Sequence, residues 1–363
     1  MKRSLLSRAA RRIKRIFNSP AEIDQVSAAV SEIRKDLRAE IGQVNTAVSE
    51  IQKNLRNEST RVQAPVISGV PILDNLICII RPTDEFELLA PPSQHKGQEV
   101  HTSFDMFDEK PDFDALAAMD TYPLPVTEDR EGYHGERHLD YWMSGLKDYM
   151  MIKELLGRYS LQLPAPVSIF DMGCASGRVL RHFMIREKDA ELWAVDINIR
   201  HVEWVRRHLD SSVKVFHGTV MPSLPIADNS FSLIYAFSVF THIDLLESAW
   251  LLELRRVLRP GGIAYLTIHS DRTWKNLNPN WGIYKGLLEG SARIREYAVT
   301  EEFLKGPMPK EKTVFTYNAS SPTFTNVFHH SDYVRNQWGR YFEIIDIVEA
   351  AHDYQDVVLL RKR

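Results

Sequence analysis

Cysteine is nearly absent from this chain of 363 residues, which contains only Cys78 and Cys174. The two lie in unlike surroundings, so the sequence has no disulfide framework of the kind that stabilises small secreted domains. This scarcity suits a chain that works in a reducing cytoplasm. With 44% hydrophobic and 26% charged residues, the composition is that of a soluble globular protein with a sizeable core.

Long apolar runs are also absent. None reaches the roughly 18 residues that a membrane-spanning helix requires. A secretory signal is excluded as well, because arginines interrupt the apolar core that it would need within residues 1–17. The sequence therefore predicts a cytoplasmic protein without a membrane span.

Positive charge is concentrated at the start of the chain. Residues 1–20 carry seven bases and no acid, whereas residues 63–363 have a net charge of −9. Such an acidic body argues against nucleic acid as a partner. Residues 1–18 combine bases with apolar residues at helical spacing, which favours an amphipathic helix on an anionic membrane surface, here the inner membrane face. A disordered basic tail is the alternative.

Residues 19–63 have the pattern of a coiled coil. A capping sequence at Ser19–Glu22 begins a helix in which apolar residues recur at steps of three and four. The segment also repeats itself, because residues 25–38 and 43–56 are identical at ten of fourteen positions. One helix cannot bury so narrow a seam, so we expect a homo-oligomer, and isoleucine and valine in the seam favour a trimer or tetramer. A helix folded back onto the body is the alternative.

The next two segments carry no clear motif. Residues 64–129 are rich in proline and acidic residues and predict a loop-rich connector, to which we assign no chemistry. After residue 130, apolar residues at helical spacing predict a helix ahead of the first buried strand.

The most informative stretch is Val167–Leu180, VSIFDMGCASGRVL. It predicts a buried strand that ends at Asp171, a tight turn from Gly173 to Gly177, and a helix beyond the turn. Both glycines can adopt positive φ and leave room for a ligand close to the backbone. The next apolar run ends in a second acid, Asp196, where an acid can hold the hydroxyls of a ribose.

Asp171, the glycine turn and Asp196 together resemble the cofactor site of class I S-adenosylmethionine-dependent methyltransferases. The turn 226–230 and the Arg259–Gly262 turn, each leading into a strand, resemble the same family. The resemblance implies that residues 130–363 form a Rossmann-like α/β sheet of seven strands in the order 3-2-1-4-5-7-6. We predict strands at 167–171, 191–196, 213–217, 232–236, 262–269, 342–349 and 355–361, and helices at 178–187, 199–209 and 244–258.

The same resemblance assigns the residues that hold S-adenosylmethionine. The methionine end would contact Asp171, Gly173, Cys174, Ala175, Ser176 and Gly177. Asp196 would bind the ribose, and Ile197 would lie beside the adenine. Thr219 and Val220 follow the third strand where many members carry an acid, so we expect backbone groups or Thr219 to read the adenine.

Two further strand ends would face the transferred methyl group. Phe237 and Ser238 would lie under the sulfonium, according to the resemblance. A hydroxyl acceptor also needs a base within hydrogen-bond reach, and His242 and His269 are the predicted catalytic residues. Either histidine can instead be an ordinary polar partner. Ser238 and Thr241 stand where some relatives carry metal-binding acids, so we predict no metal.

Aromatic residues are the candidates for binding the acceptor. In family members, helices before the first strand shape the substrate pocket, and here that region contains Tyr133, His134, Tyr141 and Trp142. Trp281 lies in an insertion at about 270–340, which we expect to be a substrate lid because loops at the carboxyl ends of strands bind ligands. Core packing of these aromatic residues is the alternative.

The sequence thus predicts an oligomeric methyltransferase at the inner membrane face. This architecture resembles methyltransferases of bacterial surface-glycan biosynthesis, so the predicted acceptor is a sugar hydroxyl of a membrane-associated glycan. A small molecule or lipid intermediate is the alternative acceptor. A third reading is a cofactor-binding scaffold without transfer activity, against which the intact Asp171, glycine turn and Asp196 argue.

Overall fold

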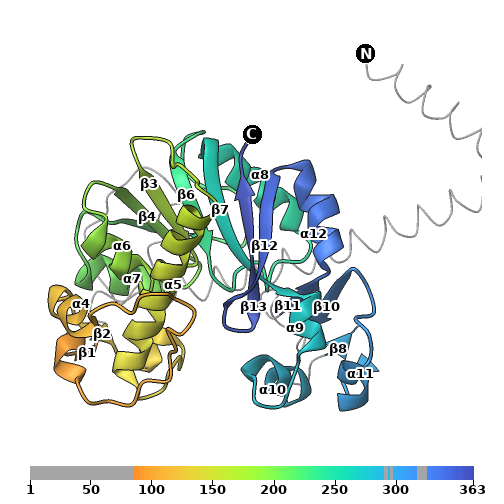
Figure 1. The fold of residues 1–363 in the computed structure, drawn as a ribbon, viewed down its shortest axis with the longest axis horizontal. Coiled ribbons are helices and arrows are strands. Elements are labelled where there is room, and N and C mark those ends of the chain that lie inside the picture. Colours follow the sequence, from red (N-terminus) through yellow and green to blue (C-terminus); the bar gives the residue numbers. More distant parts are fainter. Residues whose placement is uncertain (1–84, 290–292, 295–296, 317–324) are drawn as a thin grey trace, which may run out of the picture. The chain divides into compact units, whose positions relative to one another are not determined.

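The structure of the protein is a computed structural model that describes residues 85–289, 293–294, 297–316 and 325–363 (Figure 1). All of these residues belong to one compact unit, which begins at Leu76. The expected basic segment, coiled coil and first part of the connector, residues 1–84, lie outside the described residues. Within the part of the chain that the structure describes, no helix is long and apolar enough to cross a bilayer.

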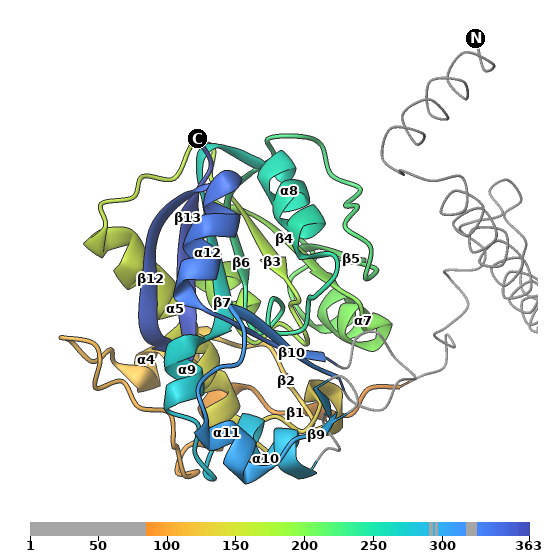
Figure 2. The ribbon, with the colours of Figure 1, turned by 90° about the vertical axis from the view of Figure 1, so that its right-hand side faces the viewer.

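A mostly parallel sheet forms the centre of this unit (Figures 1 and 2). Its main strands lie in the order β5-β4-β3-β6-β7-β13-β12, which is the predicted order 3-2-1-4-5-7-6. The first five of these run parallel, whereas β13 is antiparallel to both β7 and β12. The strands are β3 (Ser168–Met172), β4 (Glu191–Asp196), β5 (Lys214–His217), β6 (Phe231–Ala236), β7 (Leu258–Ser270), β12 (Glu343–His352) and β13 (Gln355–Arg361).

The strands were predictable because buried parallel strands are continuous apolar runs, and every residue of β3 and β6 is buried. One end differs clearly: β7 begins at Leu258 instead of 262, because Leu258 already pairs with Phe231 of β6. The third predicted helix starts later than expected. It begins at Glu247, whose carboxylate is bonded to His329 and Tyr333.

Helices cover both faces of the sheet. Side chains of one group of helices share a hydrophobic core with one face, and side chains of a second group share a core with the other face. The first group is α5 (His138–Arg158), α6 (Leu180–Arg186) and α7 (Ile199–His208). The second group is α8 (Glu247–Val257) and α12 (Ser331–Gln337), and the short helix η3 (Trp338–Arg340) follows α12.

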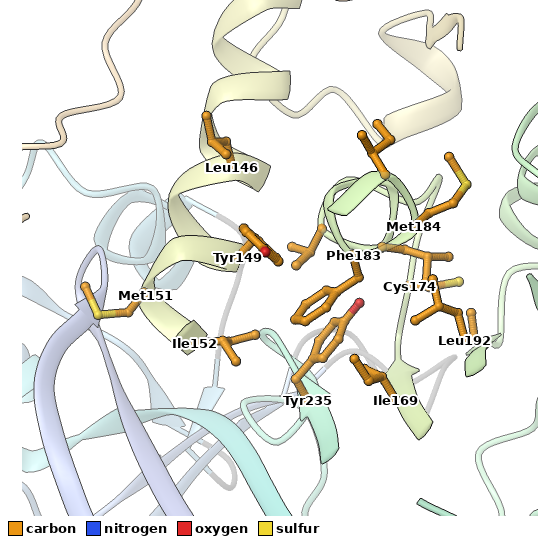
Figure 3. Close-up of a cluster of buried hydrophobic side chains, with 14 of the residues drawn as sticks. Leu146, Tyr149, Met151, Ile152, Ile169, Cys174, Phe183, Met184, Leu192 and Tyr235 are labelled. Atoms are coloured by element: carbon orange, nitrogen blue, oxygen red, sulfur yellow. The ribbon is translucent and has the colours of Figure 1, made fainter. Parts of the chain in front are cut away.

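Aromatic stacking joins α5 and α6 to the sheet, as Figure 3 shows. The ring of Phe183 on α6 is stacked on that of Tyr235 on β6, with centroids 5.1 Å apart. Tyr149 on α5 meets the edge of Phe183 at 4.9 Å. This packing holds α5 firmly beside the strand ends that matter below.

Two groups of small elements lie at the carboxyl ends of the parallel strands, at the lower end of Figures 1 and 2. The group before α5 contains β1 (Leu88–Leu89), η1 (Pro92–His95), α4 (Phe113–Met119), β2 (Leu124–Pro125) and η2 (Glu128–Arg130). The insertion after β7 contains α9 (Asp271–Lys275), α10 (Gly282–Glu289), β8 (Arg293–Ile294), β9 (Tyr297–Ala298), α11 (Glu301–Lys305), β10 (Lys312–Thr316) and β11 (Thr325–His329).

The insertion is built onto the end of β7. β11 runs parallel to the last residues of β7, with Phe328 opposite His269 and His329 opposite Ser270. The insertion also has a small hydrophobic core of its own, which includes Trp274 and Tyr284. Trp274 and Tyr284 therefore pack the insertion, whereas Trp281 is only partly buried against this core.

Candidate functional site

The glycine turn after β3 has the conformation that its sequence predicts. Gly173 and Gly177 have φ angles of +82° and +78°. A Cβ atom on Gly173 would lie 2.5 Å from Val239 Cγ2, and one on Gly177 would lie 2.7 Å from Leu209 Cδ1. Each glycine is thus required twice, for its dihedral angle and for close packing. Ala175 between them also has a positive φ, +45°, which is strained for a residue with a Cβ atom.

Asp196 at the end of β4 is tied to this turn. Its Oδ2 accepts a hydrogen bond from the Ala175 N–H at 2.8 Å, and its Oδ1 accepts one from the Asn198 N–H at 2.7 Å. The backbone N–H groups of Gly173 and Cys174 both donate to the carbonyl of Val195. The acid predicted to bind ribose therefore lies against the turn predicted to bind the methionine end.

Exposed apolar side chains surround the expected adenine position. Ile197 after β4 is 53% exposed, and Val220 after β5 is 43% exposed. The His217 ring, on the strand next to β4, is bonded through Nε2 to the carbonyl of Ile197 at 2.9 Å, so the two loops are neighbours. The hydroxyl of Thr219 accepts a bond from the Met221 N–H at 3.2 Å. This edge of the sheet offers an apolar surface that suits a flat ring.

Asp171 lies at the same edge but in a buried position. The Tyr235 hydroxyl donates to its Oδ2 at 2.8 Å. Burial raises the pKa of Asp171 to about 8, despite the opposing effect of that bond. Burial likewise raises the pKa of the Cys174 thiol, which therefore fills the loop and does not serve as a thiolate nucleophile.

Ser176 and Trp142 are placed differently from the prediction. Ser176 is fully buried, and its hydroxyl donates to the carbonyl of Asp129, so it anchors the turn to η2. Trp142 is also fully buried, and its Nε1 donates to Asp120 at 2.8 Å. Trp142 is a core residue rather than a pocket residue, because the helical pattern alone cannot tell which buried face meets a ligand.

The other predicted pocket residues before β3 lie near the turn. Tyr141 is buried, and among the described residues its hydroxyl has no hydrogen-bond partner. Burial raises the pKa of this hydroxyl, so it is un-ionised. Tyr133 is 61% exposed. His134 is held through its Nδ1, 3.2 Å from Asp140 Oδ2.

The two predicted catalytic histidines lie after β6 (His242) and at the end of β7 (His269), as expected, but in unlike environments. His242 is exposed, and its Nδ1 is bonded to the carbonyl of Thr325 at 2.6 Å. His269 is buried between the rings of Phe328 and Tyr354. Burial lowers the pKa of His269 to about 3, so it is a poor proton acceptor near neutral pH.

The hairpin turn between β12 and β13 adds residues that the sequence did not single out. Since β13 is antiparallel to β7, this turn lies at the carboxyl edge of the sheet. The Gln355 side chain donates to the Ser238 hydroxyl at 2.9 Å, and the His352 ring lies 4.8 Å from that of Phe237. Tyr354 is stacked on Trp281 of the insertion at 5.1 Å. The hairpin thus meets Phe237 and Ser238, the residues expected under the sulfonium.

A sheet of this order with a glycine turn and a strand-end acid defines a class I, Rossmann-like methyltransferase fold. Residues 170–266 match the family model described as a methyltransferase domain. The chain therefore contains a class I methyltransferase domain, and its cofactor is S-adenosylmethionine.

Curated relatives match part of the chain. A malonyl-[acyl-carrier protein] O-methyltransferase of Hahella chejuensis is 29% identical over 116 residues, which is 32% of this chain and 41% of the relative. A probable methyltransferase, PMT5, of Arabidopsis thaliana is 25% identical over 209 residues, which is 55% of this chain and 33% of the relative. The chain thus spans less than half of each of these relatives.

Solved structures with similar backbones have low sequence identity. The 1,6-didemethyltoxoflavin-N1-methyltransferase of Burkholderia thailandensis has a TM-score of 0.41 and 13% identity, covering 64% of this chain and 84% of that one. The PH0226 protein of Pyrococcus horikoshii has a TM-score of 0.41 and 18% identity, covering 65% of this chain and 98% of that one.

The described residues fit the chemical groups of S-adenosylmethionine. The glycine turn leaves space for the charged methionine end close to the backbone, and the buried Tyr141 hydroxyl offers a polar group. Asp196 would hold the ribose, and Ile197 and Val220 would lie against the adenine. Within the described ranges, no group of three or more histidine, cysteine or acidic side chains could hold a metal ion.

Proposed function

We propose that this protein transfers the methyl group of S-adenosylmethionine to a sugar hydroxyl of a membrane-associated glycan. When bound, the cofactor supplies a methyl group on a positively charged sulfur. The residues of the chain then have two tasks, to align an acceptor oxygen with that methyl group and to take up the proton that the oxygen loses.

A stack of three rings beside the expected transfer position supports this acceptor. Trp281 lies on Tyr354 with centroids 5.1 Å apart and planes 24° from parallel, and Tyr354 lies on His269 at 5.8 Å and 19°. Trp281 and Tyr354 are both only partly buried. Flat aromatic faces with polar groups nearby suit the apolar face of a sugar ring. This ring stack is the observation that carries the proposal.

The membrane and oligomer parts of the proposal depend on residues 1–63. The seven bases of residues 1–20 would hold the protein at an anionic surface, and the coiled coil would join several copies there. Binding in several copies would increase the residence of each site near a membrane-bound acceptor.

The test is the transfer of labelled methyl groups from S-adenosylmethionine into separated fractions of a host extract: lipid-linked glycan, protein, nucleic acid and small molecules. Label in the glycan fraction supports the proposal. Label only in another fraction, such as a small-molecule carboxylate or a lipid intermediate, would show that a glycan is not the acceptor. Absence of label despite cofactor binding would identify a scaffold.

Two variants make this test specific. Asp196→Ala removes the acid that meets Ala175 and Asn198, and it should abolish both cofactor binding and label. Asp189→Ala is the matched control, because Asp189 is an exposed acid in the turn before β4, at the opposite edge of the sheet. Loss of label in both variants would show that the assay reports general damage.

A further inference from the structure

The carboxyl edge of the sheet contains a histidine–aspartate pair that joins two distant parts of the chain. His352 ends β12, and Asp148 lies on α5. The Nδ1 atom of His352 lies 2.8 Å from Asp148 Oδ1. The other carboxylate oxygen, Oδ2, lies 2.6 Å from Nη1 of Arg178, just after the glycine turn.

We propose that His352 is the general base that deprotonates the acceptor hydroxyl, and that Asp148 holds it in the reactive orientation. This inference rests on the proposed methyl transfer and narrows its acceptor. A base is needed for a hydroxyl that is un-ionised at neutral pH, whereas a carboxylate acceptor needs none.

The position of His352 carries the proposal. Its ring lies 4.8 Å from the ring of Phe237, and the Gln355 amide, three residues later, donates to Ser238. Its side chain is 14% exposed, so the ring is partly open to an acceptor while its Nδ1 side is held. Tyr354, the middle ring of the stack with Trp281, is in the same turn.

The pairing also fixes the tautomer. Asp148 is buried, and although burial alone would raise its pKa, the positive charges of protonated His352 and of Arg178 lower it to about 2, so it is an ionised acceptor. A carboxylate can only accept, so neutral His352 has its proton on Nδ1 and its lone pair on Nε2. Nε2 is therefore the atom that is ready to accept a proton.

The transfer step is then balanced. The acceptor oxygen forms a bond to the methyl carbon while the carbon–sulfur bond breaks, and that electron pair stays on sulfur. The hydroxyl proton passes to Nε2 of His352, giving an imidazolium whose charge Asp148 stabilises. His242 is bonded to the Thr325 carbonyl, and His269 is deeply buried. Neither therefore has a ring that is oriented by a carboxylate beside Phe237.

A purely structural role for the pair is the competing explanation. A second ion pair, Lys147 to Asp353 at 2.8 Å, joins the same helix to the same hairpin. This gives a matched control: Asp353→Asn removes a charge link of the same kind, and asparagine tolerates the positive φ of that position.

The experiment compares His352→Gln, Asp148→Asn and Asp353→Asn in the full chain. Each is tested for S-adenosylmethionine binding by calorimetry and for label transfer into the fraction that the wild type labels. We expect all three to bind the cofactor within about threefold of the wild type. His352→Gln and Asp148→Asn should lose about 100-fold or more in transfer rate, whereas Asp353→Asn should stay within about threefold.

Nitrogen NMR of ¹⁵N-histidine protein gives a readout independent of transfer. The His352 signals, assigned by their loss in His352→Gln, should show a proton on Nδ1 in the wild type and a changed tautomer in Asp148→Asn. A proton on Nε2 in the wild type, or a normal transfer rate in His352→Gln, would refute the proposal that His352 is the general base. A wild type that binds the cofactor but labels no fraction overturns the proposed function itself, which separates the two failures.

Discussion

Asp171 is predicted to lower the stability of the fold at high pH and to strengthen cofactor binding, and both effects can be measured. Its carboxyl group is buried at the end of β3, and its pKa is raised from 3.8 to about 8, chiefly by burial. In the unfolded chain the same group ionises near pH 4. Between these values the folded protein holds a proton that the unfolded chain releases, so the stability of the fold falls as pH rises from about 4 to about 8.

The magnitude follows from the shift. One pKa unit corresponds to about 1.4 kcal/mol, so Asp171 alone should remove about 3–4 kcal/mol of the free energy of unfolding between pH 5 and pH 8. Asp171→Asn has no titrating group and keeps an oxygen that can accept the Tyr235 hydroxyl bond. The variant should therefore be more stable than the wild type at pH 8 and nearly equal to it at pH 5.

The assay is urea unfolding of both proteins at several pH values, together with calorimetric binding of S-adenosylmethionine. We expect the variant to be more stable than the wild type by about 3–4 kcal/mol at pH 8. It should bind the cofactor at least about tenfold more weakly, because Asp171 can lose its proton and pair with a cationic group, whereas an amide cannot ionise. Parallel pH dependences of stability in the two proteins would refute the reasoning.

Three further predictions address the turn, the insertion and the acceptor. Gly173→Ala should cost about 2–4 kcal/mol of stability and weaken cofactor binding, since its Cβ would clash at a positive φ. The control is Gly157→Ala, at a position on α5 with open space around it. In the same urea unfolding assay this control should be neutral or slightly stabilising. Glu247→Gln should cost about 3 kcal/mol by leaving His329 and Lys312 without their buried carboxylate, measured as a lowered Tm. Trp281→Ala should raise KM for the acceptor about tenfold and leave cofactor affinity unchanged; an unchanged KM would remove Trp281 from the acceptor site.

Much of the cofactor half could be predicted from local sequence. β3 and β4 are short apolar runs that each end in an acid, and positive φ at Gly173 and Gly177 is a property of the residue type itself. Both features can be predicted from neighbouring residues alone. The family resemblance then supplied the order of the strands.

The acceptor half could not be predicted in the same way. Asp148 and His352 are 204 residues apart, and only the antiparallel pairing of β12 and β13 beside β7 brings them together. Trp142 failed for a different reason, because an apolar helical face gives the same pattern whether it meets the core or a ligand. The position of such residues depends on strand pairing across the whole fold and on side-chain burial, and neither can be predicted from a short stretch of sequence.

The long strand β7 has a consequence for how this protein could acquire new acceptors. Its last residues belong to the small sheet of the insertion, through the pairing of His269 with Phe328, while its earlier residues belong to the cofactor sheet. The insertion packs around its own core. Under the proposed function, substitutions in that core would change acceptor recognition while the glycine turn and Asp196 stay as they are, so specificity and cofactor use could evolve separately in one domain.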